Sequence, residues 1–284
     1  MNNSLTWDKE ALLRSPLFVP LHPLLAKLGP GAFPTLQDCN ALLSARDNPV
    51  TVQSGMPLGF VPQQRGKLSF EAQYEPRCYL TGEVQMRAHN WHDLFNALVW
   101  LTFPATKAAI NARHYHALAG EGPANGFVAG SQRGTVRDVN TLLDESGVVV
   151  ACADAELAGL LVDFKWKELF WQRRDRLHGS MGFYLFGHGL YEKALQPYVG
   201  ITGQGLLIKV EKEFFAMTPA RQSKRLDSLL ADQLTLKEHS LNTRDLSPVP
   251  LLGIPGWSAD NNVECYYDNT AYFRPGRHGR LARG

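Results

Sequence analysis

The sequence predicts an α+β fold in which helices pack on short antiparallel strands within a single compact domain. Helical and strand patterns mix along the 284 residues without the regular strand–helix–strand repeat of a doubly wound sheet. No internal repeat or linker divides the chain. Apolar residues make up 44% of it and the formal charge is +2, which excludes a disordered protein and predicts a large buried core.

Three parts are expected within this domain: an N-terminal helical segment over residues 1–66, a main body over residues 67–274, and a basic, flexible tail over residues 275–284. Within the first part, Thr35 and Asp38 have the spacing of a capping box, which predicts the start of a helix.

The main body is expected to begin with two strands. Apolar and polar residues alternate over residues 68–75, which is the period-two pattern of a half-buried strand. Thr81 and Gly82 then predict a turn into a second strand over residues 83–87.

Two consecutive helices are predicted next. Asn90 can cap the first helix, at whose third position Asp93 could reach back to the backbone N–H of the cap. Pro104 suits the first turn of the second helix, which is expected to run to about Leu118. The glycine-rich residues 119–134 are expected to form an exposed loop.

A hairpin is expected after this loop, with strands at residues 141–144 and 148–153. Asp154 is then placed to cap a long helix that extends through Trp171.

Residues 181–196 leave two alternatives open: one buried helix, or a strand that breaks at Gly187 before a helix. A strand near residues 206–210 and an amphipathic helix capped by Thr218 follow. The proline- and tyrosine-rich C-terminal fifth is expected to wrap over the core.

Composition and termini predict a cytoplasmic protein that does not enter a membrane. The N-terminus lacks the basic start and apolar run of a signal peptide. The most apolar window, residues 94–103, is about half as long as the ~18 residues of a membrane span. The four cysteines are scattered without a Cys-x-x-Cys pair, as expected for reduced thiols.

Four polar side chains interrupt the apolar helices after residue 90. His92 and Asn96 share one helix face, and Asn111 and His114 share a face of the next helix. Each needs a partner or a ligand, because an unpaired buried polar group costs about 1–3 kcal/mol. Neutral imidazole also suits metal binding or proton transfer near pH 7. The alternative is that His92 and its neighbours only cap and support the start of the helix.

His188 and Glu192 form a second polar pair in an apolar stretch. On a helix their spacing places the imidazole beside the carboxylate, as a metal-ligand pair or an oriented acid–base pair requires. The alternative is a buried histidine that the carboxylate orients for packing.

A third group of charges lies at and before the predicted hairpin. Arg137 could hold an anionic substrate, and Asp138 could orient a histidine. Asp144 and Glu145 could bind a cation through oxygen ligands, but their place between two predicted strands favours a simple turn.

A run of basic and aromatic residues supports a different functional class. A nucleic-acid-binding protein would use such a run to bind phosphates and stack bases. The net charge of only +2 and the usual burial of helical aromatics disfavour this class. The run comprises Lys165, Trp166, Lys167, Phe170, Trp171, Arg173, Arg174 and Arg176.

Several common catalytic motifs are absent from the sequence: the phosphate-binding P-loop, the dinucleotide fingerprint, the Gly-x-Ser-x-Gly elbow and the His-Glu-x-x-His zinc motif. Their absence disfavours the corresponding P-loop, dinucleotide, α/β-hydrolase and zinc-protease chemistries.

Six motifs occur in order between about Phe70 and Arg277: NWHDLFNALVWLTFP, NARH, RDVNTLLDESG, WKELFW, FGHGLYEK and PLLGIPGW. In these motifs the chain resembles the bacterial family called domain of unknown function 3025. The resemblance implies a cytoplasmic bacterial protein and brings no reaction or ligand. Gly189 departs from it, because alanine is expected there.

The pattern around His92 is also faintly similar to the metal core of His-Asn-His nucleases, but its histidine–asparagine segment is too short for their usual loop.

These observations lead to the hypothesis of an enzyme with hydrolytic or acid–base chemistry, acting on a small molecule or an anionic substrate. A divalent metal ion is one option, with His92, His188 and Glu192 as its ligands. The competing hypothesis is a non-catalytic protein that contacts nucleic acid or a protein partner through the basic aromatic helix. The expected catalytic residues are His92, Asn96, Asn111, His114, His188 and Glu192.

Overall fold

The computed structural model describes residues 5–120, 132–236 and 241–276. The helices are α1 (Lys9–Arg14), α2 (His22–Leu25), α3 (Leu36–Ser44), α4 (Tyr74–Thr81), α5 (Trp91–Thr102), α6 (Pro104–Gly120), α7 (Gln132–Ser146), α8 (Ala155–Val162), α9 (Arg174–Leu177), α10 (His188–Ala194) and α11 (Pro219–Leu236). The strands are β1 (Gly59–Pro62), β2 (Glu83–Met86), β3 (Gly147–Cys152), β4 (Met181–Leu185), β5 (Thr202–Lys209) and β6 (Leu246–Pro250). Short 3₁₀ turns include η1 (Pro16–Leu21), and η2 (Glu168–Gln172) is a π-helical turn.

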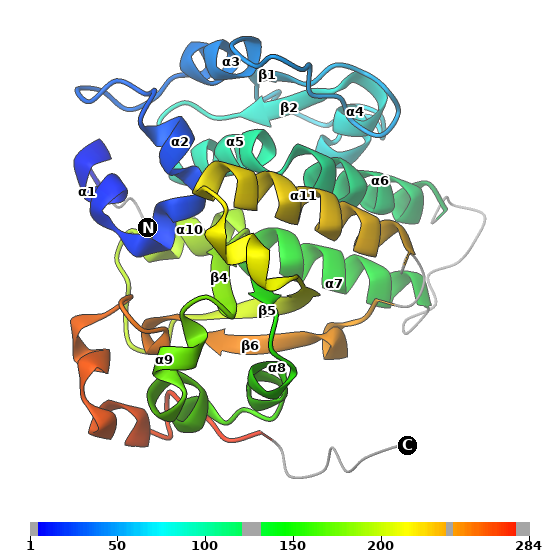
Figure 1. The fold of residues 1–284 in the computed structure, drawn as a ribbon. Helices are drawn as coiled ribbons and strands as arrows, with labels where there is room; N and C mark the ends of the chain where they lie inside the picture. The colour runs from blue at the N-terminus through cyan, green and yellow to red at the C-terminus, as the bar shows by residue number, and fades with distance from the viewer. Residues whose placement is uncertain (1–4, 121–131, 237–240, 277–284) are drawn as a thin grey trace.

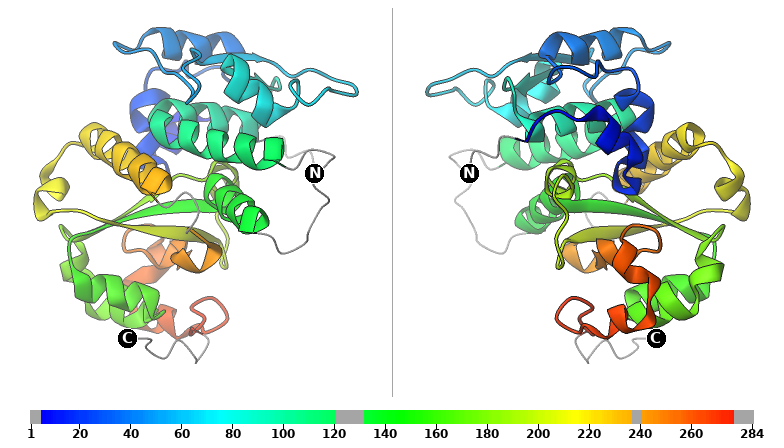
Figure 2. Two further views of the ribbon diagram at one scale, coloured as in Figure 1. Left: turned by 90° about the vertical axis from the view of Figure 1, so that its right-hand side faces the viewer. Right: turned by 90° about the vertical axis from the view of Figure 1, so that its left-hand side faces the viewer.

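The elements form layers around a four-stranded sheet (Figures 1 and 2). Helices α5, α6, α7 and α11 lie on one face of this sheet, and α8, α9 and the C-terminal segment lie on the other. The smaller sheet of β1 and β2 lies with α3 and α4 beyond α5 and α6. None of the helices in the described ranges has the length and apolar character needed to cross a membrane.

The larger sheet has the strand order β4-β3-β5-β6. Its central strand β3 is buried along its whole length, as a strand covered on both faces should be. β3 pairs antiparallel with β4 and parallel with β5, while β1 and β2 form a parallel pair. The predicted α+β class is therefore confirmed, although the strands are mixed rather than all antiparallel.

The predicted starts of three helices are confirmed. Thr35 and Asp38 form a capping box at α3, and Asn90 accepts the N–H of Asp93 at 3.0 Å to cap α5. Asp93 does not reach back to the cap as predicted, because its carboxylate binds the backbone N–H and guanidinium of Arg87. The helix predicted from Pro104 is α6.

The predicted strand over residues 68–75 is wrong. Turns lead into α4 at Tyr74, and this helix buries Pro76 and Cys78. β2 takes β1 as its partner instead. β1 also lies within the N-terminal segment, residues 1–66, that was expected to be helical.

The predicted hairpin is also wrong in its first half. Residues 141–144 belong to α7, on which Val139 and Leu143 lie one turn apart and are fully buried. Gly147 lets the chain pass from this helix directly into β3, because a Cβ there would lie 2.3 Å from the carbonyl oxygen of Leu143. Only the second predicted strand exists, as β3.

The remaining predictions had mixed outcomes. Asp154 caps α8, but this helix ends at Val162, and Phe164 has a positive φ of 60° that breaks the predicted long helix. Residues 181–196 take the second alternative, β4 followed by α10. The strand near 206–210 is β5, and the helix after Thr218 is α11. The expected loop at 119–134 and the tail from 275 lie largely outside the described residues.

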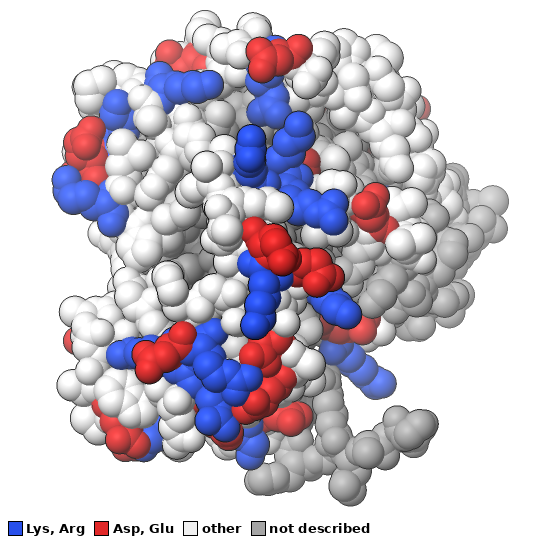
Figure 3. Space-filling view, in the orientation of Figure 1, with Lys and Arg blue, Asp and Glu red and all other residues white. Residues whose placement is uncertain are grey.

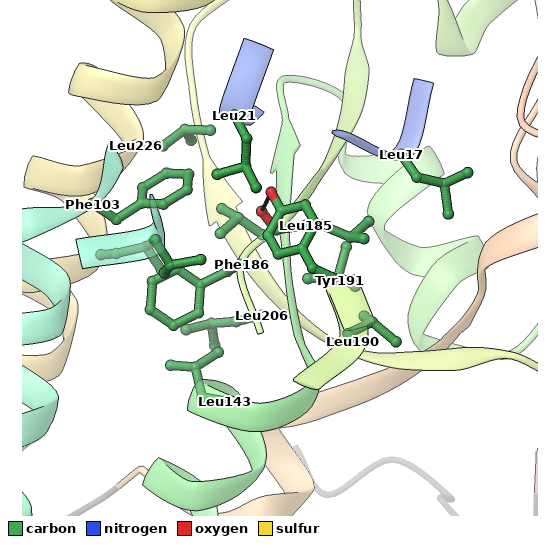
Figure 4. Close-up of a cluster of buried hydrophobic side chains, with 14 of the residues drawn as sticks. Leu17, Leu21, Phe103, Leu143, Leu185, Phe186, Leu190, Tyr191, Leu206 and Leu226 are labelled. Atoms are coloured by element: carbon green, nitrogen blue, oxygen red, sulfur yellow. Dashed lines mark hydrogen bonds between the residues drawn. The ribbon is translucent and has the colours of Figure 1, made fainter. Parts of the chain in front are cut away.

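A cluster of buried side chains joins the sheet to the helices above it (Figure 4). In this cluster the Tyr191 hydroxyl donates a hydrogen bond of 2.6 Å to the carbonyl of Leu185. Leu143 directly precedes Asp144, and Leu190 follows His188 by two residues, so the core fixes the positions of these two polar residues. The labelled members are Leu17, Leu21, Phe103, Leu143, Leu185, Phe186, Leu190, Tyr191, Leu206 and Leu226.

Candidate functional site

Three helix ends meet at one polar site. His92 lies in the first turn of α5, Glu145 in the last turn of α7, and His188 is the first residue of α10. The two histidines are separated by 96 residues in the sequence. The site therefore depends on tertiary packing.

The ring nitrogens and one carboxylate of this site converge. Nε2 of His92 lies 3.0 Å from Nε2 of His188. Oε1 of Glu145 lies 3.5 Å from Nε2 of His188 and 3.8 Å from Nε2 of His92. One ligand atom from each residue thus lies within 4.8 Å of the other two, an arrangement that could hold a metal ion. We call His92, Glu145 and His188 the triad.

The opposite ring nitrogens of the two histidines face other carboxylates. Nδ1 of His92 lies 3.1 Å from Oε2 of Glu192. Nδ1 of His188 lies 3.7 Å from Oδ2 of Asp144. Asp144 also forms a close ion pair with Lys107 of α6. Each ring therefore faces the other two members of the triad with its Nε2 atom and a further carboxylate with its Nδ1 atom.

The site has an exposed side and a buried side. The side chains of His92 and Glu145 are 31% and 44% exposed, whereas that of His188 is only 7% exposed. Burial alone would raise the pKa of Asp144, but the charges of Lys107 and His188 outweigh it and hold this pKa below its ordinary value. The interaction with the His188 ring, 3.5 Å away, lowers the pKa of Glu145. Both carboxylates are thus anions at neutral pH.

Two glycines allow the close approach of α10 to the end of α7. A Cβ at Gly187 would lie 2.5 Å from the backbone nitrogens of Ser146 and Gly147. A Cβ at Gly189 would lie 2.4 Å from Oε2 of Glu145. Because neither residue has a side chain, His188 and Glu145 can come within contact distance.

Among the predicted site residues, the structure brings His92, His188 and Glu192 together. Glu192, predicted as the third metal ligand, instead binds the Nδ1 side of His92, and Glu145 takes its place beside the two Nε2 atoms. The predicted ligand set stays a prediction, and the geometry adds Glu145 as a candidate ligand.

Asn96, Asn111 and His114 belong to a neighbouring group that we call the Glu75 cluster, in which His114 lowers the pKa of Asp144 and Asp144 raises that of Glu75. Asn96 donates a hydrogen bond of 2.6 Å to the hydroxyl of Tyr74. Asn111 donates one of 2.6 Å to the carboxylate of Glu75. Burial raises the pKa of Glu75, and His114 and Asn111 offset this effect only in part. α4 thus provides partners for the side-chain nitrogens of Asn96 and Asn111, while their Oδ1 atoms are buried without a hydrogen-bond partner among the described residues.

Of the predicted substrate-binding pair, the structure describes the side chain of Asp138 only. Arg137 lies in α7, but its side chain is outside the described part of the molecule. Asp138 is exposed and precedes Glu145 by two helical turns, which is about 10 Å along the axis. Orientation of a histidine by Asp138 therefore finds no support.

Three further residues of the site were not among the expected catalytic residues. Asp144 and Glu145 were considered as cation ligands, but their predicted place between two strands favoured a turn. Lys107 stands in an apolar helix with only 3% of its surface exposed. A lysine at a core position of a helix is a signal for a buried acidic partner, but it does not identify that partner.

The basic aromatic run offers little free surface for nucleic acid. Lys167 is ion-paired with Asp268 and Glu264, and Trp166 and Phe170 are buried. Figure 3 shows acidic and basic side chains interleaved over the α8 and α9 region. This surface does not favour binding to a polyanion.

Fold and site together define an α+β protein with a partly exposed histidine–carboxylate triad. Residues 58–277 match the family described as "Protein of unknown function (DUF3025)". This match covers most of the chain, so the chain belongs to this family. No curated protein and no solved structure matches the chain.

Proposed function

We propose that this protein is a metal-dependent hydrolase whose metal ion is held by His92, Glu145 and His188. The observation that carries the proposal is the convergence of Nε2, Nε2 and a carboxylate oxygen at separations of 3.0, 3.5 and 3.8 Å. Ligands that surround a zinc ion tetrahedrally at about 2.1 Å lie about 3.4 Å apart. The triad therefore needs little rearrangement to bind such an ion.

The number and type of ligands support catalysis rather than a structural metal. Structural zinc sites use four protein ligands, whereas catalytic sites use three, such as two histidines and a glutamate, and leave one position open. A zinc-like ion supplies a water nucleophile at neutral pH. The partial exposure of His92 and Glu145 gives a substrate access to this open position.

The alternative explanation is that the two imidazoles only hydrogen-bond to each other and join α5 to α10. Zinc loading followed by dialysis and elemental analysis separates the two explanations. We expect one zinc per chain in the wild type, and none in His188→Ala or His92→Ala with the fold intact by circular dichroism. His178→Ala removes an exposed histidine after α9 and is the matched control, so it should bind zinc normally.

A wild-type protein that binds no zinc, or a His188→Ala variant that binds it normally, contradicts the metal site. The hydrolytic part is tested with chromogenic carboxylic ester and phosphoester probes. Turnover should be lost on chelation, restored by zinc, and absent in Glu145→Gln. If the protein binds zinc but hydrolyses neither kind of probe in a chelator-sensitive way, a hydrolase that acts on carboxylic esters or phosphoesters is contradicted.

A further inference from the structure

The buried side of His188 has an unusual environment. Nδ1 of this ring is buried and has no hydrogen-bond partner among the described residues, although the Asp144 carboxylate lies 3.7 Å away. Buried polar atoms are nearly always paired in native proteins, so an unpaired one calls for an explanation. Hydrogen bonds at functional sites are often long in the ligand-free state and shorten when the ligand binds.

The Lys107–Asp144 ion pair behind this ring is buried as well. The Lys107 side chain is 4% exposed and that of Asp144 is 14% exposed. Buried ion pairs are often no more stabilising than a well-packed apolar pair of similar volume. Their retention in a core therefore suggests a role other than stability. Here the lysine comes from α6 and holds the carboxylate of α7 at a fixed place beside His188.

We propose that Asp144 is a positioning residue of the metal site and that Lys107 holds its carboxylate in place. In this arrangement Nδ1–H of His188 donates to Asp144, which leaves the lone pair of Nε2 directed at the point shared with His92 and Glu145. The inference rests on the proposed function. Carboxylates that hold a ligating histidine in this way typically raise metal affinity 10–100-fold.

The sharpest variant replaces both charges at once. Lys107→Met with Asp144→Leu exchanges the ion pair for an apolar pair and leaves neither partner of that pair as an unpaired charge, so the fold is expected to survive. Asp163→Asn is the control, because it removes an exposed aspartate at the end of α8, on the opposite face of the sheet.

Two measurements test the assignment. In metal-free protein with ¹⁵N-labelled histidine, NMR should show the Nδ1–H tautomer for His188 in the wild type and in Asp163→Asn, and its loss in the double variant. Zinc affinity, measured by competition with a chromophoric chelator, should fall about 10–100-fold in the double variant and stay unchanged in the control.

The outcomes separate this inference from the proposed function. If the wild type binds zinc and the double variant keeps both the tautomer and the affinity, Asp144 is not a positioning residue, while the metal site stands. If the wild type binds no zinc, the proposed function fails, and the role of Asp144 at a metal site fails with it.

Discussion

Asp144 and Glu75 are both buried carboxylates of the helical layer, but their surroundings act on them in opposite directions. Beside Asp144, Lys107 and His188 outweigh the effect of burial and lower the pKa. Around Glu75, His114 and Asn111 offset burial only in part, and the pKa is raised. The ion pair with Lys107 thus holds the pKa of Asp144 down, whereas His114 and Lys107, which also lower the pKa of Glu75, do not outweigh its burial.

This difference separates a region suited to metal chemistry from a region suited to packing. An obligatory anion beside His188 is useful where a positive ion is to be bound. A carboxylate that shares hydrogen bonds with Asn111 can join α4 to α6 in either protonation state. We therefore propose the surroundings of Asp144 as the functional region, while the catalytic role of Asn96, Asn111 and His114 stays a prediction.

The largest effect is expected from Lys107→Met alone. This change leaves Asp144 as a buried charge without its cation, and breaking a buried ion pair in this way typically costs about 3–5 kcal/mol. Urea unfolding of the variant and of the wild type measures the loss. Lys224→Met, which alters an exposed lysine of α11, should change the unfolding free energy by less than about 0.5 kcal/mol. A Lys107→Met protein as stable as this control would contradict the expected cost of breaking the ion pair.

A smaller effect is expected from Gly189→Ala, which tests how closely the triad depends on the position of Glu145. The new methyl group would lie only 2.4 Å from Oε2 of Glu145, so the carboxylate has to rotate away. Alanine is also the better helix former, by roughly 0.5–1 kcal/mol. We expect about a tenfold loss of zinc affinity, as for other disturbed metal surroundings, without a loss of thermal stability.

The opposite outcome for Gly189→Ala would contradict the role of Glu145. If zinc affinity is unchanged in a chelator competition assay, Glu145 is not a ligand. Glu192 would then return as the candidate for the third ligand, as the sequence predicted.

The parts of the fold that the sequence predicted are those encoded by neighbouring residues. The caps at Asn90 and Asp154 and the proline at the start of α6 act within one turn of helix, so their patterns were sufficient. The strand predicted at 68–75 failed because alternation alone does not specify a partner strand. β2 pairs instead with β1, whose register places Phe60 opposite Val84.

The sequence also predicted only part of the candidate site. The scarcity of polar groups around His92 and His188 indicated chemistry at both, and the structure places them in contact. Glu145 was missed because its neighbours have the composition of a turn, and only the tertiary position of α7 shows it as the end of a helix. The sequence also grouped Asn111 with the histidines, although its partner is Glu75 of α4.

The smallest effect is expected from Glu75→Gln, and its size depends on pH. Because the pKa of Glu75 is raised in the folded protein, folding is penalised while the group is ionised at neutral pH. As the pH falls through the raised pKa toward the ordinary value of 4.5, the folded state takes up the proton before the unfolded chain does. The wild type therefore gains stability relative to the glutamine variant over this interval.

At neutral pH, Glu75→Gln should be the more stable protein, because glutamine is neutral and still offers a carbonyl oxygen to Asn111. Its advantage should shrink toward pH 4.5, the ordinary value for glutamate. Urea midpoints of both proteins at a series of pH values measure this difference, and contributions from all other acids cancel in the comparison. Zinc affinity should not change. A variant that instead loses zinc affinity would place the Glu75 cluster within the metal site and remove the separation between the two carboxylates.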